Sequence, residues 1–269
     1  MARQEQLAYS DQLLAGYSRL GTNQPGQPKP ESLAMQRRPL PMTPNYHKGF
    51  TLFELAIVLI IISILAGGLF VSLGAQIEQQ QRHATQQTLN DIRDALLGFA
   101  ASHYATDGKP YLPCPDTDGD GIENRNGVLC TQYSGQIPWS DLGLGNQDAW
   151  GNRFDYRVEK AFSQRDNGFT LASNATIKVC EQATCTTVLG NGLPLVILSH
   201  GPNGLGATNS QNKLLPAAVS ADEIENTNAD AIFVSHTPTP IGTNEFDDLL
   251  VWLSPNTLYN RMIAAGRLP

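Results

Sequence analysis

A single carboxylate at the edge of a long uncharged segment is the feature that most constrains this chain. Residues 55–73 contain no charged side chain, and Glu54 comes directly before them. The stretch from Phe50 to Leu73 can cross a bilayer core of about 30 Å as a helix that rises about 1.5 Å per residue. A carboxylate at bilayer depth costs about 2.5–3.5 kcal/mol on insertion scales, so an acid at this position indicates a function. We therefore expect a transmembrane helix over residues 50–73.

The residues around the start of this segment form a motif. Lys48 and Gly49 precede Phe50, and Glu54 is the fifth residue counted from Phe50. This order of basic residue, Gly, Phe, acid and apolar helix resembles the processing site of type IV prepilins and type II secretion pseudopilins. The resemblance implies that a prepilin peptidase cuts between Gly49 and Phe50 and methylates the new amino group. It also implies that Glu54 pairs with the Phe50 ammonium of a neighbouring subunit, which offsets the cost of both charges.

Charge is divided unevenly between the two sides of the apolar segment. Residues 1–49 carry six Lys or Arg and three acids, a net charge of +3, which leaves −10 for the rest of a chain whose net charge is −7. Basic flanks stay on the cytoplasmic side, so the C-terminal part is expected in the periplasm of a single-pass inner-membrane protein, and later in a filament. Its acidity argues against nucleic acid as a partner.

Residues 1–49 are interpreted as a cytoplasmic leader that the peptidase removes. The family usually has shorter basic leaders, and initiation at Met42 would leave only eight residues before the cleavage site. We hypothesise that translation starts at Met42, and a peptide from residues 1–41 detected in cells would contradict this.

Beyond the apolar segment the helical pattern continues and then stops. Residues 74–105 are predicted to form an amphipathic helix that ends near Tyr104, with one apolar stripe. The members of that stripe are Ile77, Ala84, Leu89, Ile92, Leu96, Leu97, Phe99 and Ala100.

Residues 106–269 are predicted to form a globular β-rich head with long loops. The strand candidates are Arg153–Val158, Phe169–Leu171, Thr176–Val179, Leu193–Ser199, Ala231–Val234 and Leu249–Leu253. Long helices do not alternate with these strands, which favours an antiparallel α+β head over a parallel α/β fold. The resemblance implies a type IV pilin-like fold, in which the long N-terminal helix packs on the sheet.

All four cysteines follow the apolar segment, and an even count in a translocated domain favours disulfides. Three pairings are open, and the pairing Cys114–Cys130 with Cys180–Cys185 is preferred because both loops are short. Four buried free thiols are the alternative. A zinc site is less favoured because the spacing is not C-x-x-C and no His lies near either pair.

Two groups of acids are candidate calcium ligands. Asp116, Asp118 and Asp120 form the D-x-D-x-D-G start of a calcium loop, but the twelfth position of an EF-hand is Gly127, so an EF-hand is excluded. A smaller loop that uses Glu123 or Asn124 is one alternative, and a solvated turn is the other.

The second group follows from a weaker resemblance in the head. The segment from Asp148 to Tyr156 resembles the D-x-W-G-N-x-x-x-Y segment of major pseudopilins, and Asp248 to Trp252 resembles their D-x-x-x-W. That region binds one calcium ion in the relatives. The ligands implied here are Asp248, with Asp247, Asn203 and backbone oxygens near Ser199 as helpers. Ser199 to Gly204 resembles the strand-end glycine loop of the same relatives. About forty residues separate Gly204 from Asp247 here, whereas the relatives have few.

A structural role is expected, and no enzymatic one. Ser199 and His200 are sequence neighbours without a G-x-S-x-G motif, and the five His residues are scattered. We expect a subunit, of the minor kind, of a type IV pilus or a secretion pseudopilus. Its expected partners are the prepilin peptidase, other pilins or pseudopilins and the inner-membrane assembly platform. A filament-tip adhesin or ligand-binding minor pilin is the alternative.

Overall fold

The computed structural model of this chain describes residues 49–228, 230–240 and 242–269, and for residues 66–73 it describes the backbone alone. The leader, and with it the Met42 hypothesis, lies outside the described residues. The helices are α1 (Leu52–Ser102), α2 (Trp139–Leu142), α3 (Lys160–Ser163), α4 (Ala221–Thr227) and α5 (Pro255–Ala264). The strands are β1 (Arg125–Asn126), β2 (Leu129–Cys130), β3 (Ser134–Gln136), β4 (Asp155–Val158), β5 (Ile177–Cys180), β6 (Val188–Leu193), β7 (Leu195–Ser199), β8 (Ile232–Val234) and β9 (Leu249–Leu253).

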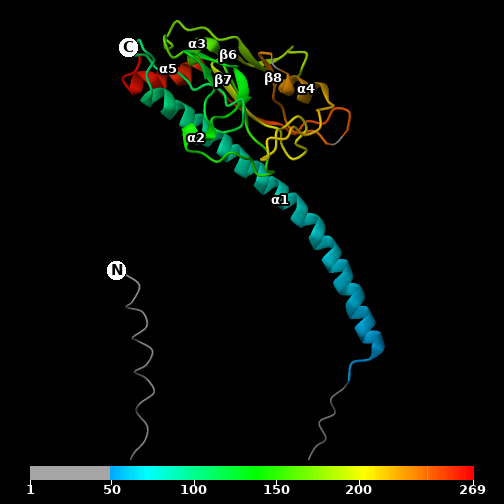
Figure 1. Cartoon of the computed structure of the whole chain (residues 1–269). Coiled ribbons are helices and arrows are strands. Elements are labelled where there is room, and N and C mark those ends of the chain that lie inside the picture. The colour runs from blue at the N-terminus through cyan, green and yellow to red at the C-terminus, as the bar shows by residue number, and fades with distance from the viewer. Residues whose placement is uncertain (1–48, 229, 241) are drawn as a thin grey trace, which may run out of the picture. The chain divides into compact units, whose positions relative to one another are not determined.

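The head consists of layers built around one central antiparallel sheet (Figure 1). This sheet has the strand order β3-β4-β7-β9, and its central strand β7 is buried along its whole length. The C-terminal half of α1 and helix α5 pack on one face of it, and a smaller sheet with the order β6-β5-β8 packs on the other. The α+β class is therefore confirmed, although β5 and β8 pair in parallel.

The sequence alternation of β7 explains why the sheet has a core on both faces. Leu195 and Ile197 join the cluster under α1, whereas Val196 and Leu198 join the cluster under the smaller sheet. An uninterrupted apolar strand is the pattern expected where both faces are covered.

Helix α1 is one helix of 51 residues, and only its second half contacts the head. The predicted stripe is correct from Leu89 onward, but Ile77 is 56% exposed and Ala84 is also exposed. Thr85 is buried in their place because its hydroxyl bonds the head. We call Thr85, Leu89, Ile92, Leu96 and Ala100 the head-facing stripe.

Several head elements differ from the prediction. Phe169–Leu171 is not a strand but a loop, and its apolar character reflects the Phe169 ring, which is buried against Phe162. Strand β6 was not predicted, since two glycines and exposed apolar residues hide its alternation.

Helices α4 and α5 were also missed, although capping signals mark both starts. Ser220 accepts a hydrogen bond from the Glu223 N–H, and Ser254 accepts one from the Thr257 N–H ahead of Pro255.

The C-terminal residues Arg267 and Leu268 pack against the C-terminal end of α1. The Arg267 guanidinium donates through Nε to the Ala101 carbonyl oxygen, and it lies 4.2 Å from the centre of the Tyr104 ring. Leu268 is buried in the cluster under α1. A cation at a helix C-terminus satisfies a carbonyl that the helix leaves unpaired.

We expect Ile92→Ala to lower the free energy of unfolding by about 2–5 kcal/mol, because it removes a fully buried side chain from the head-facing stripe. Gly98→Ala is the matched control on the exposed face of α1, where an added Cβ meets nothing within 4 Å. It should raise stability by about 1 kcal/mol. Urea unfolding in detergent, followed by circular dichroism, measures both, and equal effects would contradict the packing described here.

Candidate functional site

The predicted cleavage site lies on exposed chain. Gly49 and Phe50 precede the first turn of α1, and the Phe50 side chain is 77% exposed. A Cβ at Gly49 would meet nothing within 4 Å. Glu54 lies in the first turn of α1, where a negative charge interacts favourably with the helix dipole. The junction is therefore open to another protein.

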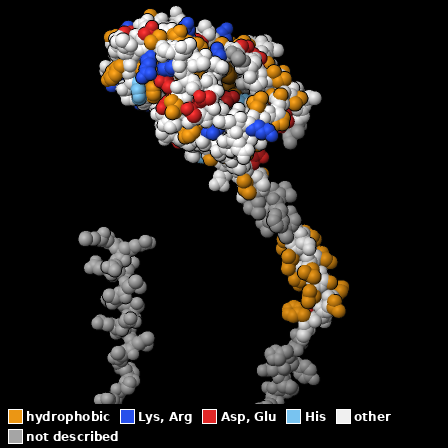
Figure 2. Space-filling view, in the orientation of Figure 1, with side chains coloured by type: hydrophobic (Ala, Val, Ile, Leu, Met, Phe, Trp, Pro, Cys, Tyr) orange, Lys and Arg blue, Asp and Glu red, His pale blue; other side chains and the backbone are white. Residues whose placement is uncertain are grey.

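The first half of α1 presents apolar side chains that the head does not cover. We call residues 50–65 the arm, and Figure 2 shows its hydrophobic surface. Leu52 is 92% exposed and Ile64 is 70% exposed. Among the residues whose side chains the structure describes, no helix is long and apolar enough to cross a membrane. The predicted span over residues 50–73 includes residues 66–73, for which the structure describes the backbone alone.

A turn of the head attaches to α1 near the point where the helix leaves the head. Ala149 donates its N–H to the Thr85 hydroxyl and accepts a hydrogen bond from the Gln81 side chain. The buried Asp148 carboxylate orders this turn by accepting hydrogen bonds from the Trp150 and Asn152 N–H groups. Burial raises the pKa of Asp148, and its hydrogen bonds oppose that rise. The D-x-W-G-N segment therefore positions α1.

Three carboxylates from distant parts of the sequence meet inside the head. Glu223 lies on α4, and Asp247 and Asp248 directly precede β9. All three are buried, at 1%, 6% and 4% exposure, and one oxygen of each lies within 4.8 Å of the others. We call them the buried acidic cluster.

Each member of the buried acidic cluster has an oxygen without a hydrogen-bond partner among the described residues. These oxygens are Glu223 Oε2, Asp247 Oδ1 and Asp248 Oδ1. The remaining oxygens are satisfied: the Asp247 N–H and the Asn203 amide donate to Glu223 Oε1, and the Asn203 N–H donates to Asp247 Oδ2. An unsatisfied buried carboxylate oxygen is costly, so these three oxygens are candidate ligands for a cation.

The electrostatics of the buried acidic cluster reflect its burial and crowding. Burial, followed by the charges of Glu223 and Asp248, raises the pKa of Asp247 to about 7 against a lowering hydrogen bond from Asn203. Burial also raises the pKa of Glu223. His200 lies beside the cluster, with Nδ1 3.6 Å from Asp248 and Nε2 3.0 Å from Asp155. Burial lowers the pKa of His200, but these two carboxylates outweigh it and raise the pKa to about 10.

Calcium fits this arrangement better than a transition metal does. Calcium prefers carboxylate and amide oxygens at about 2.3–2.6 Å, and two oxygens on one ion then lie at most about 5 Å apart. The sequence predicted Asp247, Asp248 and Asn203, and the structure brings them together. The sequence analysis did not identify Glu223 as a candidate ligand, because Glu223 lies in the long segment between Gly204 and Asp247. The S-x-x-E capping pattern at Ser220 could have placed Glu223 on a helix, but nothing local marked it as a ligand.

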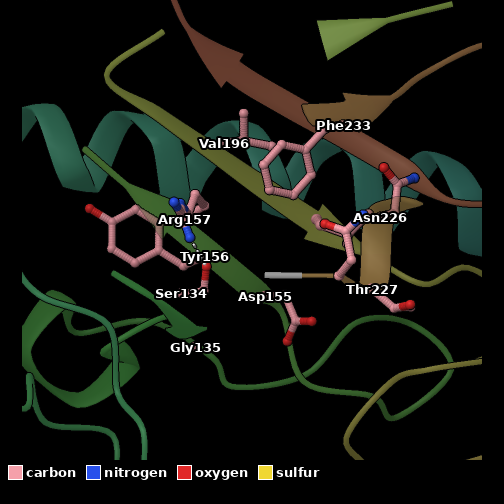
Figure 3. A pocket seen from close by; sticks show the side chains of 11 residues that line it. Ser134, Gly135, Asp155, Tyr156, Arg157, Val196, Asn226, Thr227 and Phe233 are labelled. Carbon is pink, nitrogen blue, oxygen red and sulfur yellow. Dashed lines mark hydrogen bonds between the residues drawn. The ribbon is translucent and has the colours of Figure 1, made fainter. Parts of the chain in front are cut away.

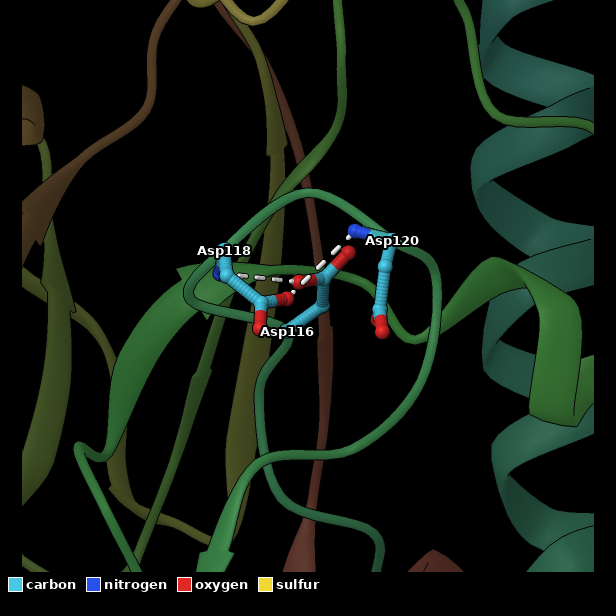
Figure 4. A group of neighbouring side chains, drawn as sticks. All are labelled: Asp116, Asp118 and Asp120. Carbon is cyan, nitrogen blue, oxygen red and sulfur yellow. Dashed lines mark hydrogen bonds between the residues drawn. The ribbon is translucent and has the colours of Figure 1, made fainter.

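The acids of the first calcium candidate form a separate group on one loop (Figure 4). Asp116 is fully buried and accepts hydrogen bonds from the Asp118, Gly119 and Gly121 N–H groups, while Asp118 and Asp120 point outward. Burial raises the pKa of Asp116 against these hydrogen bonds. The main role of Asp116 that the geometry supports is to order the loop.

The two other candidate ligands of that loop have protein partners. Glu123 accepts a hydrogen bond from the Cys114 N–H and forms a 2.8 Å ion pair with Arg125. Asn124 accepts from the Thr117 hydroxyl.

Disulfides join Cys114 to Cys130 and Cys180 to Cys185, the local pairing that the sequence favours. The first closes the loop that holds Asp116, and the second closes the turn between β5 and β6. Among the described residues no cysteine is free.

Ser199 and His200 do not act on each other. The Ser199 hydroxyl donates to Asp148, at 2.7 Å, whereas His200 bonds Asp155. This pair therefore lacks the contact that a nucleophile and its base require.

The comparison with protein families supports the motif that the sequence shows around Gly49 and Phe50. A family model described as the prokaryotic N-terminal methylation motif matches residues 44–70. The chain is therefore a type IV prepilin-like or pseudopilin-like protein, and its motif indicates a structural pilin rather than an enzyme. The motif implies processing by a prepilin peptidase, membrane anchoring and assembly with other pilins. No curated protein and no solved structure matches the chain.

The raised pKa of Asp247 predicts a pH dependence of stability. A carboxyl group whose pKa is higher in the folded protein contributes stability at low pH and loses it as the pH rises from about 4 through about 7. In cation-free protein, we expect the free energy of unfolding to fall over this range, and Asp247→Asn to reduce the slope. The exposed Asp166→Asn is the control for the charge change. Equal slopes in all three proteins would contradict the assignment.

Proposed function

We propose that this protein is a minor subunit of a type IV pilus or of a secretion pseudopilus. In this proposal the peptidase cuts after Gly49, Phe50 becomes the methylated N-terminus, and the chain assembles through α1. Before assembly the segment from residue 50 to residue 73 holds the protein in the inner membrane with the head in the periplasm. The single observation that carries the proposal is the exposed apolar arm directly behind a methylation motif.

The arrangement of α1 supports assembly by helix packing. The head covers only the stripe from Thr85 to Ala100, so the arm remains available to the helices of other subunits. Burying apolar surface contributes about 25 cal/mol per Å², which favours helix bundling once the arm has left lipid. Glu54 would then pair with the Phe50 ammonium of the next subunit, which aligns neighbouring helices in one register. This pairing also offsets the burial of both charges.

Size supports a minor position in the filament. Removal of residues 1–49 would leave 220 residues, more than a typical major subunit has.

We expect Glu54→Ala to be processed normally and to assemble poorly, because the register-setting charge is lost while the cleavage site is intact. Asp91→Ala, an exposed acid in the head-associated half of α1, is the matched control and should assemble normally. Mass spectrometry of sheared filaments and of washed membranes would locate the peptide that begins with methylated Phe50. An unprocessed N-terminus in both fractions, or normal filaments from Glu54→Ala, would overturn the proposal.

We further infer that the buried acidic cluster binds one calcium ion that stabilises the head. Glu223, Asp247 and Asp248 would supply the charged ligands, and each has an unsatisfied oxygen for the purpose. Together with Asp155, which also pairs with the protonated His200, the three carboxylates leave three negative charges, two of which one divalent cation would balance. The ion would tie α4 to the start of β9, and through it the segment between Gly204 and Asp247 to the central sheet.

Calcium at one hundred times its dissociation constant should stabilise the protein by about 2.7 kcal/mol relative to protein in chelator. Thermal unfolding with calcium, with magnesium and with chelator measures the shift. Glu223→Gln should abolish the shift, whereas Asp118→Asn, in the exposed acidic loop, should retain it. The opposite result for these two variants would assign calcium to the Asp116 loop, and no shift in the unsubstituted protein would exclude a calcium site.

A further inference from the structure

Helix α4 carries one member of the buried acidic cluster but has no apolar anchor in the head. Its two buried residues, Glu223 and Asn226, are both polar, and Ile224, its one large apolar residue, is 47% exposed. The helix has only seven residues, too few to be stable by itself. Hydrogen bonds from polar side chains must therefore set the position of α4 and of Glu223.

A cavity lies where α4 ends. It measures about 210 Å³ and lies between the end of α4, strand β8 and the strands β3, β4 and β7 of the central sheet. The smaller sheet ends at β8, so it does not fill this space. Figure 3 shows Thr227 of α4 and Phe233 of β8 at the cavity, together with Asp155 of β4. We call it the sheet cavity, and because of it the end of α4 does not pack on the central sheet.

Asn226 holds the cavity side of α4. Its side chain bonds both the N–H and the carbonyl of Val234 on β8, and it donates to Asp248 of the buried acidic cluster. The last turn of α4 is thus fixed to β8 by polar contacts.

Asp222 holds the first turn of α4 from two sides. Its Oδ1 accepts a hydrogen bond of 2.7 Å from the Ala183 N–H, and its Oδ2 lies 3.2 Å from Nε2 of His236. Asp222 directly precedes Glu223. These contacts therefore act on the backbone next to a member of the buried acidic cluster.

The turn that carries Ala183 lies between β5 and β6 and is closed by the Cys180–Cys185 disulfide. Cys185 has a φ of 50°, a left-handed conformation that residues other than glycine rarely adopt. Such a conformation persists where the surrounding structure holds it. The covalent link to the buried Cys180 supplies such a constraint, and it keeps the Ala183 N–H directed at Asp222.

His236 connects Asp222 to the other segment of the buried acidic cluster. Its ring stacks on the ring of Phe246, with 3.9 Å between the two centroids. Phe246 is fully buried and directly precedes Asp247. Asp222 is therefore linked, through one ring pair, to the chain that carries the remaining two acids.

We propose that the turn closed by Cys180–Cys185 sets the calcium affinity of the buried acidic cluster, with Asp222 as the positioning residue through which it acts. This role rests on the calcium site inferred above. Glu223 comes from α4 and Asp247 from the chain before β9, so an ion between them requires a fixed spacing of the two segments. Groups that orient metal ligands typically change metal affinity by about 10- to 100-fold when they are removed.

Titration calorimetry of calcium into the full-length protein in detergent tests the role of Asp222. Asp222→Ala and Asp222→Asn remove the same charge, but asparagine keeps a carbonyl oxygen that can accept from the Ala183 N–H. We expect Asp222→Ala to raise the calcium dissociation constant at least tenfold and Asp222→Asn to raise it less than threefold. Equal dissociation constants for the two variants would overturn the proposal.

Removal of the disulfide tests the same connection from its other end. Cys180→Ser with Cys185→Ser should raise the calcium dissociation constant at least tenfold, whereas Cys114→Ser with Cys130→Ser should change it less than threefold. If the turn acts through Asp222, adding Asp222→Ala to the first pair should raise the constant less than threefold further. Independent effects would multiply to at least a hundredfold, and that result would refute a connection through Asp222.

Amide hydrogen exchange in chelator gives a second measurement that needs no calcium. Loss of the Cys180–Cys185 disulfide should speed exchange in α4 relative to β4, and unchanged protection of α4 would contradict the positioning role. Thermal unfolding verifies that each variant is folded, and where the serine pair does not fold, the two Asp222 variants decide. Absence of calcium binding by the unsubstituted protein would overturn the calcium site and this inference together. Calcium binding that every variant retains unchanged would overturn this inference alone.

Discussion

The packing of one half of a single helix on the central sheet is the interaction on which the rest of this structure depends. The head-facing stripe buries Leu89, Ile92 and Leu96 completely, and the same helix continues without a break into the uncovered arm. One half of this helix is therefore held by the head, and the other half remains uncovered. The Asp148 turn adds a polar attachment at the last contact, where apolar packing alone would let the helix slide. In the proposed assembly, α1 would join the head to the helices of neighbouring subunits.

The buried acidic cluster is the least favourable part of the head when it is considered without a cation. One oxygen of each of the three carboxylates lies within 4.8 Å of the others, and each carboxylate has an oxygen that accepts no hydrogen bond from a described residue, although His200 Nδ1 lies 3.6 Å from Asp248 Oδ1. A protein core tolerates such an arrangement only when protons or a cation neutralise it. Asn203, Asn226 and His200 surround the cluster with donors, so its geometry is held by neutral and cationic groups rather than by apolar packing. The cluster therefore resembles a prepared binding site more than a structural ion pair.

The sequence predicted the features whose physical signal is local. The uncharged segment, the Gly49–Phe50 junction and the apolar spacing from Leu89 to Ala100 each lie within a short window. The positions of most strands followed from short apolar runs for the same reason. The sequence did not predict that Glu223 joins Asp247 and Asp248, because their proximity depends on how α4 packs against β9. Nor did it predict the sheet cavity, which exists because one three-stranded sheet covers a four-stranded one incompletely. Ile77 and Ala84 continue the apolar spacing, and only the real extent of the head shows that nothing covers them.

The closure of α1 by Arg267 and Leu268 has a consequence for the order of folding during synthesis. Helix α1 emerges first, but the strand and helix that complete its core, β9 and α5, follow about 150 residues later. The apolar stripe of α1 therefore stays uncovered while nearly the whole head is synthesised. It is covered only when β9 and α5 have been made. Such long-range contacts are slow to form, and exposed apolar surface in the interval favours aggregation. A protein of this design gains from a membrane or a chaperone that shelters its first helix until the chain is complete.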